Sequence, residues 1–232
     1  MTALLTLLLG IMAVLAPGGA DRPVLRRRAA PELVTAQIVV LVVGALLGAL
    51  VLGLPWWQTA AAILPAGLWS VLARLVVGPR ASLGCWGAAL AVVALCAALQ
   101  DEPQAAARRA ADLCRGGAGC LLLLTTPANR LVIDLLAVAR GRTRASDAAE
   151  ADGDAPLRGG RWIGPLERIL LLLLASAGAH HTAIAAVIAA KGVVRFPEIS
   201  RDEGGGKAEE FLIGSLASWA LAVLAAMLLT RP

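Results

Sequence analysis

The chain has 232 residues, of which 59% are hydrophobic, 16% charged and 3% aromatic. An average soluble domain is roughly half apolar and about a quarter charged, whereas this chain has a mean hydropathy of +0.77. The composition therefore excludes a soluble enzyme, a secreted disulfide-rich module and a nucleic-acid-binding domain.

Charged residues are missing from three long stretches, residues 33–73, 81–100 and 169–190. A membrane helix needs roughly 20 apolar residues to cross about 30 Å of hydrocarbon, so each stretch can hold at least one span. Taken along the whole chain, the apolar runs predict an all-α polytopic transmembrane helix bundle of about seven or eight spans.

The net charge is +5, yet most of the 21 Lys and Arg residues occupy short segments between apolar runs. This is the positive-inside pattern, which sets orientation and attracts anionic lipid headgroups to the basic loops. The expected partners are therefore the lipid bilayer and its anionic headgroups, and no nucleic acid.

Residues 1–104 are predicted to form an N-terminal four-helix transmembrane region. Residues 1–16 form a short apolar first span, followed by arginines instead of being preceded by them. A signal peptide carries its positive charge first, so we expect a retained span with its N-terminus outside, and a cleaved signal is the alternative. The next three spans are predicted at residues 33–54, 58–77 and 81–99.

Residues 105–160 are predicted to be an interfacial or broken-helix segment followed by a basic, mobile linker. A polar surface helix is expected at 105–116. Residues 117–139 would measure about 34 Å as a helix, long enough to cross, but they are interrupted around Pro127. If this segment crosses, the basic linker lies inside, as the charge rule prefers; if it lies in the interface, the linker is outside.

A first group of polar candidates, Asn129, Arg130 and Asp134, follows this break. Arg130 and Asp134 are four residues apart, so on a helix their side chains meet and can neutralise each other. A proline break beside such a pair is typical of a discontinuous helix that lines a polar pathway. The alternative is an amphipathic helix in the interface with a narrow polar stripe.

Residues 161–232 are predicted to form a C-terminal transmembrane hairpin and a final span. Two short helices at 161–178 and 180–195 would place both of their outer ends on the basic side, whereas one tilted helix over 163–190 would separate the basic residues. The last span is expected at 211–230.

The hairpin contains a second group of candidates, Glu167, Arg168, Lys191 and Arg195. We expect Glu167 and Arg168 at or just below the headgroups, where ionisable groups need partners, and Lys191 or Arg195 can pair with Glu167. Two interpretations of this group are a structural clamp and a substrate or lipid-headgroup site.

No catalytic, cofactor or metal site is predicted. The adjacent His180 and His181 would point about 100° apart on a helix and cannot chelate one metal, and no phosphate loop or nucleophile elbow is present. Small residues spaced by four, such as Gly44 and Gly48, permit close helix packing and allow a homo-oligomer or a partner membrane protein. A matching stripe on the last span is Gly214, Ser218, Ala222 and Ala226.

The runs at 125–129, 164–168, 189–196 and 210–218 resemble, over about residues 120–230, an uncharacterised family of bacterial integral membrane proteins, a domain of unknown function. The resemblance implies a bacterial inner (plasma) membrane and no particular activity.

These features favour a non-enzymatic membrane component or accessory subunit of uncharacterised role. One alternative is a small transporter or channel with its pathway at the broken helix around Pro127. Another is a membrane enzyme that acts on lipid headgroups through Glu167.

Overall fold

The computed structural model describes residues 1–16, 30–76, 78–99, 106–141, 160–178, 181–200 and 206–230. Across these ranges the regular structure is entirely helical, which confirms the all-α prediction. The chain divides into two compact units, Met1–Ala155 and Pro156–Pro232.

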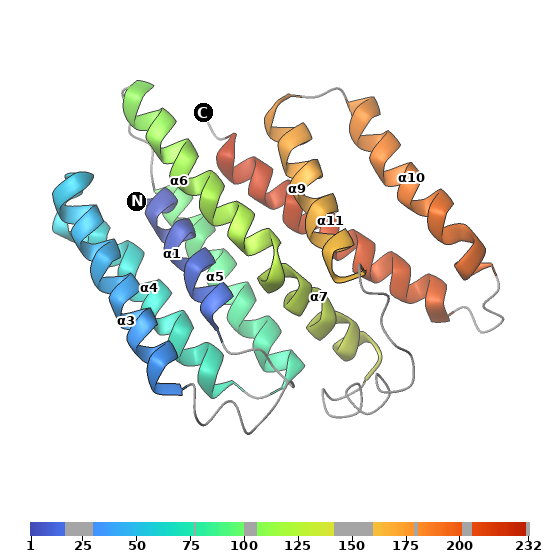
Figure 1. The fold of residues 1–232 in the computed structure, drawn as a ribbon, viewed down its shortest axis with the longest axis horizontal. Coiled ribbons are helices and arrows are strands. Elements are labelled where there is room, and N and C mark those ends of the chain that lie inside the picture. The colour runs from blue at the N-terminus through green and yellow to red at the C-terminus, as the bar shows by residue number, and fades with distance from the viewer. Residues whose placement is uncertain are drawn as a thin grey trace. The chain divides into compact units, whose positions relative to one another are not determined.

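The helices of the first unit are α1 (Thr2–Leu15), α3 (Ala30–Leu46) with a π-helical extension η1 (Leu47–Val51), α4 (Trp56–Leu75), α5 (Pro79–Ala98), α6 (Ala106–Leu124) and α7 (Thr126–Ala139). Helices α3, α4 and α5 run in alternating directions, as Figure 1 shows. Alternation of this kind is expected when short loops join neighbouring helices that each cross the same layer.

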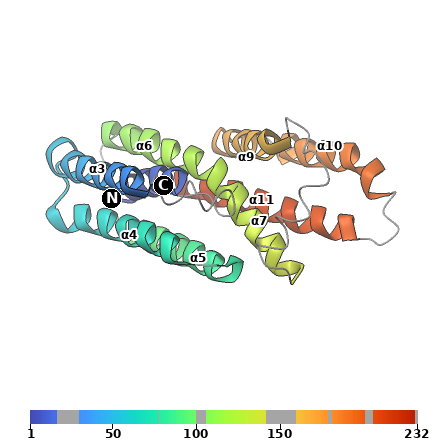
Figure 2. The same cartoon turned by 60° about the horizontal axis from the view of Figure 1, so that its bottom comes forward.

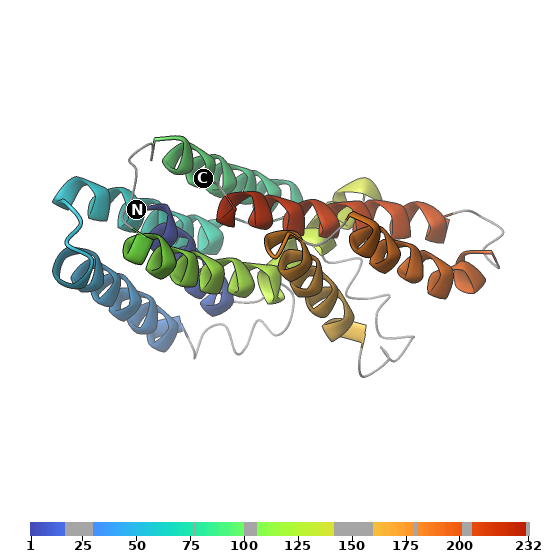
Figure 3. The ribbon, with the colours of Figure 1, turned by 90° about the horizontal axis from the view of Figure 1, so that it is seen from above.

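The short first helix forms the centre of this unit. Figures 2 and 3 show α1 between the α4–α5 pair on one side and α3 and α6 on the other. Its side chains Leu4, Leu5, Leu8 and Met12 are at most 2% exposed. An apolar helix that is buried over most of its surface is a core element, so α1 organises the helices around it.

Glycine allows α1 and α6 to approach each other closely. A Cβ atom built on Gly119 would lie 2.5 Å from backbone atoms of Thr6 and Leu7, and one on Gly10 would lie 2.8 Å from the carbonyl oxygen of Gly119. The predicted small-residue pair on α3 has a similar role, because Gly44 receives the side chain of Leu8. Close packing of this type is a principal source of helix association in membranes.

By length and composition, three helices can cross a membrane: Pro31–Val51, Pro79–Ala98 and Ala208–Leu229. The bent pair Cys114–Leu124 and Thr126–Ala139 makes a fourth if it counts as one span. The described helices thus provide three or four candidate spans, fewer than the seven or eight predicted.

The number of candidate spans is lower than predicted because several helices are too short or too polar. Helix α1 has 14 residues, which extend about 21 Å, and α9 has 17, which extend about 26 Å. Both fall short of the roughly 30 Å of a hydrocarbon layer. Helix α4 has 20 residues, but Gln58, Pro65 and Ser70 lower its hydropathy.

The predicted interruption near Pro127 is present, although its surroundings differ from the prediction. The expected polar surface helix and the first part of the apolar segment are one continuous helix, α6. The axis then bends by 43° at Thr125, whose hydroxyl donates to the carbonyl oxygen of Leu122 at 2.6 Å. Pro127 lies in the first turn of α7, where its missing N–H is not required.

The second unit contains α9 (Gly160–Ser176), α10 (His181–Ile199) and α11 (Gly206–Leu229). The stretch that could have been one tilted helix is divided into two helices, α9 and α10, which Figure 1 shows antiparallel, and a hairpin that crosses the membrane stays a prediction. The chain turns at Gly178 with φ of +69°, a left-handed conformation that glycine adopts without strain. Most of the predicted linker, residues 145–159, lies outside the described residues.

Helix α9 packs against the small-residue stripe of α11. Ser218, Ala222 and Ala226 are at most 5% exposed, as expected for a close helix contact. Helix α10 is covered far less, because Val193, Val194 and Phe196 are each at least 66% exposed.

Candidate polar sites inside the helical units

The described residues combine a few buried charged side chains with many exposed large apolar ones. Arg168 is 2% exposed and Asp134 is completely buried, whereas Leu50, Trp56 and Val194 are 74–82% exposed. Arg and Asp are almost never fully buried in soluble proteins, and extensive exposed apolar surface marks contact with a membrane or another protein. The described surface therefore suits a hydrocarbon environment.

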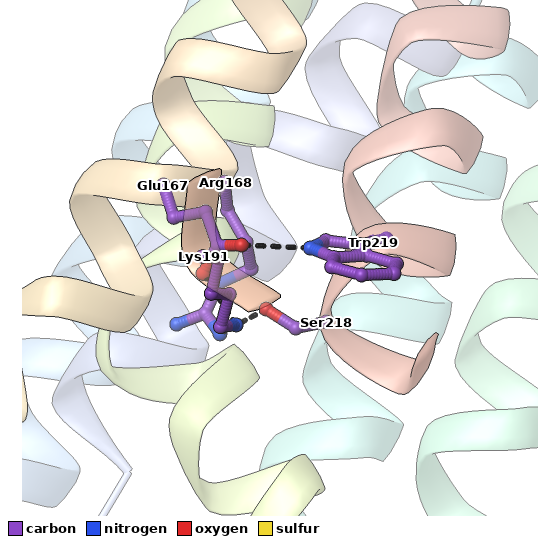
Figure 4. A network of polar contacts seen from close by, with 5 residues as sticks. All are labelled: Glu167, Arg168, Lys191, Ser218 and Trp219. Atoms are coloured by element: carbon purple, nitrogen blue, oxygen red, sulfur yellow. Dashed lines mark hydrogen bonds and ion pairs between the residues drawn. The ribbon is translucent and has the colours of Figure 1, made fainter. Parts of the chain in front are cut away.

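The second unit holds a polar network that joins all three of its helices. The Nζ atom of Lys191 on α10 donates to Oε2 of Glu167 on α9 at 2.6 Å. The indole Nε1 of Trp219 on α11 donates to Oε1 of Glu167 at 2.7 Å. Both oxygens of the carboxylate therefore accept a hydrogen bond, and Figure 4 shows the indole nitrogen of Trp219 directed at one of them.

Arg168, the next residue on α9, extends the network. Its Nη1 donates to Oγ of Ser218 at 3.0 Å, and the contact is buried. We call Glu167, Arg168, Lys191, Ser218 and Trp219 the mid-helix cluster. A buried guanidinium needs hydrogen-bond acceptors, because desolvation without them costs several kcal/mol.

Lys191 is the most accessible charged member of the cluster. Its side chain is 24% exposed, compared with 9% for that of Glu167. Its Nζ also lies 5.6 Å from the ring centroid of Trp219 and 5.8 Å from that of Phe211, within range of a cation–π attraction. The ammonium is thus held by one carboxylate and two aromatic faces while part of the side chain stays open.

The cluster lies at the middle of its helices. In the candidate span Ala208–Leu229, ten residues precede Ser218 and ten follow Trp219. Ten helical residues extend about 15 Å, which is half of a hydrocarbon layer about 30 Å thick. The partners on α11 therefore place Glu167 and Arg168 level with the middle of that candidate span, and their position at or just below the headgroups stays a prediction.

Of the predicted partners for Glu167, the structure pairs Lys191 with it, and the side chain of Arg195 lies outside the described residues. Trp219 was not among the predicted partners, and Ser218 was expected only as a small packing residue. The available signal was an indole, with its N–H donor, at the centre of an apolar span, where tryptophan is not at its usual interfacial depth.

In the first unit, Arg130 serves a role that sequence analysis did not predict. Its Nη1 donates to the carbonyl oxygens of Ala16 at 3.0 Å and Ala13 at 3.4 Å. These carbonyls end α1 and lack intrahelical partners, and a cation near a helix C-terminus also complements the helix dipole. Arg130 therefore ties α7 to the end of the central helix.

The other members of the first candidate group are on the same helix. Asp134 is fully buried one turn beyond Arg130, and the backbone N–H of Asn129 donates to the carbonyl oxygen of Thr125 at 3.2 Å. A direct Arg130–Asp134 ion pair stays a prediction. The structure thus brings together the bend between α6 and α7, the buried carboxylate of Asp134 and the C-terminal end of α1.

Another polar contact joins α3 to α4. Gln37, only 4% exposed, accepts a hydrogen bond through Oε1 from Arg74 at the end of α4. Among the described residues, no group of three or more His, Cys, Asp or Glu side chains can hold a metal ion. His180 and the side chain of His181 lie outside those residues.

Comparisons of the chain with protein-family models, curated proteins and solved structures gave no match.

Proposed function

We propose that the chain is an integral membrane protein without catalytic activity, a membrane component or accessory subunit of the bacterial inner (plasma) membrane with its N-terminus outside. The observation that carries the proposal is the extensive exposed apolar surface of the two units. Many large apolar side chains are exposed, and the charged residues Arg168 and Asp134 are buried. An apolar surrounding makes that distribution favourable.

The proposal includes the shorter helices as part of the membrane domain. Helix α1 is shielded by its neighbours, so it need not match the full hydrocarbon thickness by itself. With α4 and the α9–α10 hairpin also embedded, the count rises to about seven or eight crossings. Arg74 and Arg80 flank the α4–α5 turn and Arg140 follows α7, and Figure 1 shows these helix ends directed toward one side of the first unit. The positive-inside rule supports that side as cytoplasmic.

In this proposal the mid-helix cluster is a clamp. A charged group at mid-membrane costs roughly 3 kcal/mol on insertion scales, and pairing offsets that cost. Because Glu167 accepts from both α10 and α11, its carboxylate selects one arrangement of the three helices. Separating the helices would expose charge to hydrocarbon, so the network favours the assembled unit.

Cysteine labelling tests the topology. In a variant that lacks Cys85, Cys96, Cys114 and Cys120, new cysteines at Ser146 and Gly205 should be protected from a membrane-impermeant maleimide in intact cells and react after permeabilisation. A cysteine at Asp101 should react in intact cells and serves as the external control. Labelling of either internal site from outside would overturn the proposed orientation and the embedded hairpin.

A second candidate function is a small transporter or channel, and the bend at Thr125 favours it. Discontinuous helices line polar pathways in transporters, and here the bend is followed by Arg130 and, one turn later, by the buried carboxylate of Asp134. The test is Arg130→Ala combined with Asp134→Ala, followed by proton and chloride flux in reconstituted vesicles. Unchanged abundance and oligomeric state with abolished flux would refute the purely structural role, whereas destabilisation alone would remove the main support for transport.

A further inference from the structure

The ammonium of Lys191 is held by side chains of the other two helices of its unit. Its Nζ donates to Oε2 of Glu167 on α9 at 2.6 Å. It also lies 5.6 Å from the ring centroid of Trp219 and 5.8 Å from that of Phe211, both on α11. We call Glu167, Trp219 and Phe211 the ammonium box. Aromatic faces bind ligand cations in many proteins, and a carboxylate adds an acceptor for their N–H groups.

The ammonium box is assembled without any residue of α10. The indole of Trp219 donates to Oε1 of Glu167 at 2.7 Å, which joins α9 to α11 directly. The same two helices are joined a second time by the contact of Arg168 with Ser218 at 3.0 Å, as Figure 4 shows. These contacts hold the carboxylate and the indole in place whichever ammonium group lies between them.

Helix α10 supports Lys191 only weakly within the second unit. None of the α10 side chains that the structure describes is buried, and 24% of the Lys191 side chain is exposed. The ammonium box is therefore filled by one flexible side chain with an open side, through which that side chain can be withdrawn.

We propose that the ammonium box binds a primary alkylamine with an apolar tail, and that Lys191 is a tethered competitor for this ligand. The inference rests on the proposed function and adds a ligand to it. The ligand is a primary amine because its N–H group must replace the hydrogen bond from Lys191 to Glu167. It carries an apolar tail because the box lies level with the middle of a candidate span and is reached through an apolar medium.

A proton transfer lets the two amines exchange without leaving a charge in hydrocarbon, where an ionised group is unfavourable. The ligand arrives as the neutral amine, and the proton on Nζ of Lys191 passes to the ligand nitrogen. Lys191 then withdraws as a neutral amine, while the new ammonium donates to Oε2 of Glu167. Both nitrogens are primary alkylamines, so the number of charges in the cluster is the same before and after the exchange.

The test measures the binding of tritiated n-hexylamine to the purified full chain in maltoside micelles by scintillation proximity. Hexan-1-ol has the same tail without a charge, and trimethylhexylammonium has a permanent charge and cannot accept a proton. We expect saturable binding that unlabelled hexylamine displaces and that neither analogue displaces at the same concentration.

Variants of the chain identify the site. If Lys191 fills the box in about nine of ten molecules, Lys191→Ala should raise the apparent affinity for hexylamine about tenfold. Lys191→Arg keeps a cation in the box that cannot give up its proton, so it should abolish binding. Phe211→Leu removes one aromatic face and should weaken binding about threefold. The matched control is Phe196→Leu, because Phe196 is 66% exposed on α10, and it should leave binding unchanged.

Several results overturn the inference. Displacement by hexan-1-ol would mean that charge is not recognised, and displacement by trimethylhexylammonium would exclude the proton transfer. Unchanged binding in Lys191→Arg and Phe211→Leu would place hexylamine elsewhere, and these two variants decide the question if circular dichroism shows that Lys191→Ala does not fold. If cysteine labelling supports the topology but hexylamine does not bind, this inference fails while the proposed function stands.

Discussion

Replacement of Glu167 by Gln tests whether the mid-helix cluster stabilises the second unit. The amide retains the shape of the side chain and can still accept the hydrogen bond from Trp219, but it cannot balance the charge of Lys191. Removing one partner of a buried ion pair typically costs 3–5 kcal/mol, because the other charge is left uncompensated. Since the side chain of Lys191 is 24% exposed, we expect a loss at or below the lower limit of that range, about 2–3 kcal/mol.

The assay is reversible unfolding in mixed detergent micelles, followed by circular dichroism. Glu209→Gln is the matched control, because Glu209 is exposed in the first turn of α11 and its replacement should change the free energy of unfolding by less than about 0.5 kcal/mol. Glu167→Gln combined with Lys191→Met should be less destabilised than the sum of the two single variants, since no uncompensated charge then remains at position 191. The reasoning is refuted if Glu167→Gln costs no more than Glu209→Gln, or if the two single effects are additive.

Three further predictions concern other positions and use the same unfolding assay. Gly119→Ala places a Cβ against the backbone of α1 and should destabilise the first unit by about 1–3 kcal/mol. The control Gly117→Ala should be neutral or stabilising, because no atom lies within 4 Å of its added Cβ. Equal effects of the two substitutions would contradict the packing of α1 on α6. Arg130→Met removes the donor to the carbonyl oxygens of Ala13 and Ala16 and should lower the free energy of unfolding by about 1–3 kcal/mol. Arg130→Lys should restore part of that loss. An unchanged unfolding midpoint for Arg130→Met would show that the contact does not stabilise the fold. Gly178→Ala forces a left-handed conformation on a residue with a Cβ and should cost about 1–2 kcal/mol, and a stabilised variant would contradict the turn.

Composition and local pattern were sufficient for the class of structure. A low charge content and long uncharged stretches predicted an all-α, membrane-type chain, and the described residues are helical with three or four candidate spans. The bend near Pro127 and the hairpin turn at Gly178 were also predictable. Each depends on residues that are close in the sequence and on backbone preferences that those residues impose directly.

The number of spans was less predictable, because hydropathy alone does not distinguish a helix that crosses from one that is shielded by its neighbours. Residues 1–16 have the composition of a short span or a signal peptide, and their place at the centre of the first unit comes from close contacts at Gly10 and Gly119. Those contacts join segments more than 100 residues apart. No local pattern specifies which two glycines will face each other.

Residue order alone predicts that charge occurs among apolar helices and that Glu167 needs a partner. Helix packing is what makes Lys191 and Trp219 the partners and brings Arg130 to the end of α1. It also decided that the cluster lies at the middle of α11. The physical reason is that hydropathy and helix-breaking residues act within one segment, whereas a buried charge is stabilised by whichever donors and acceptors helix packing brings to its level.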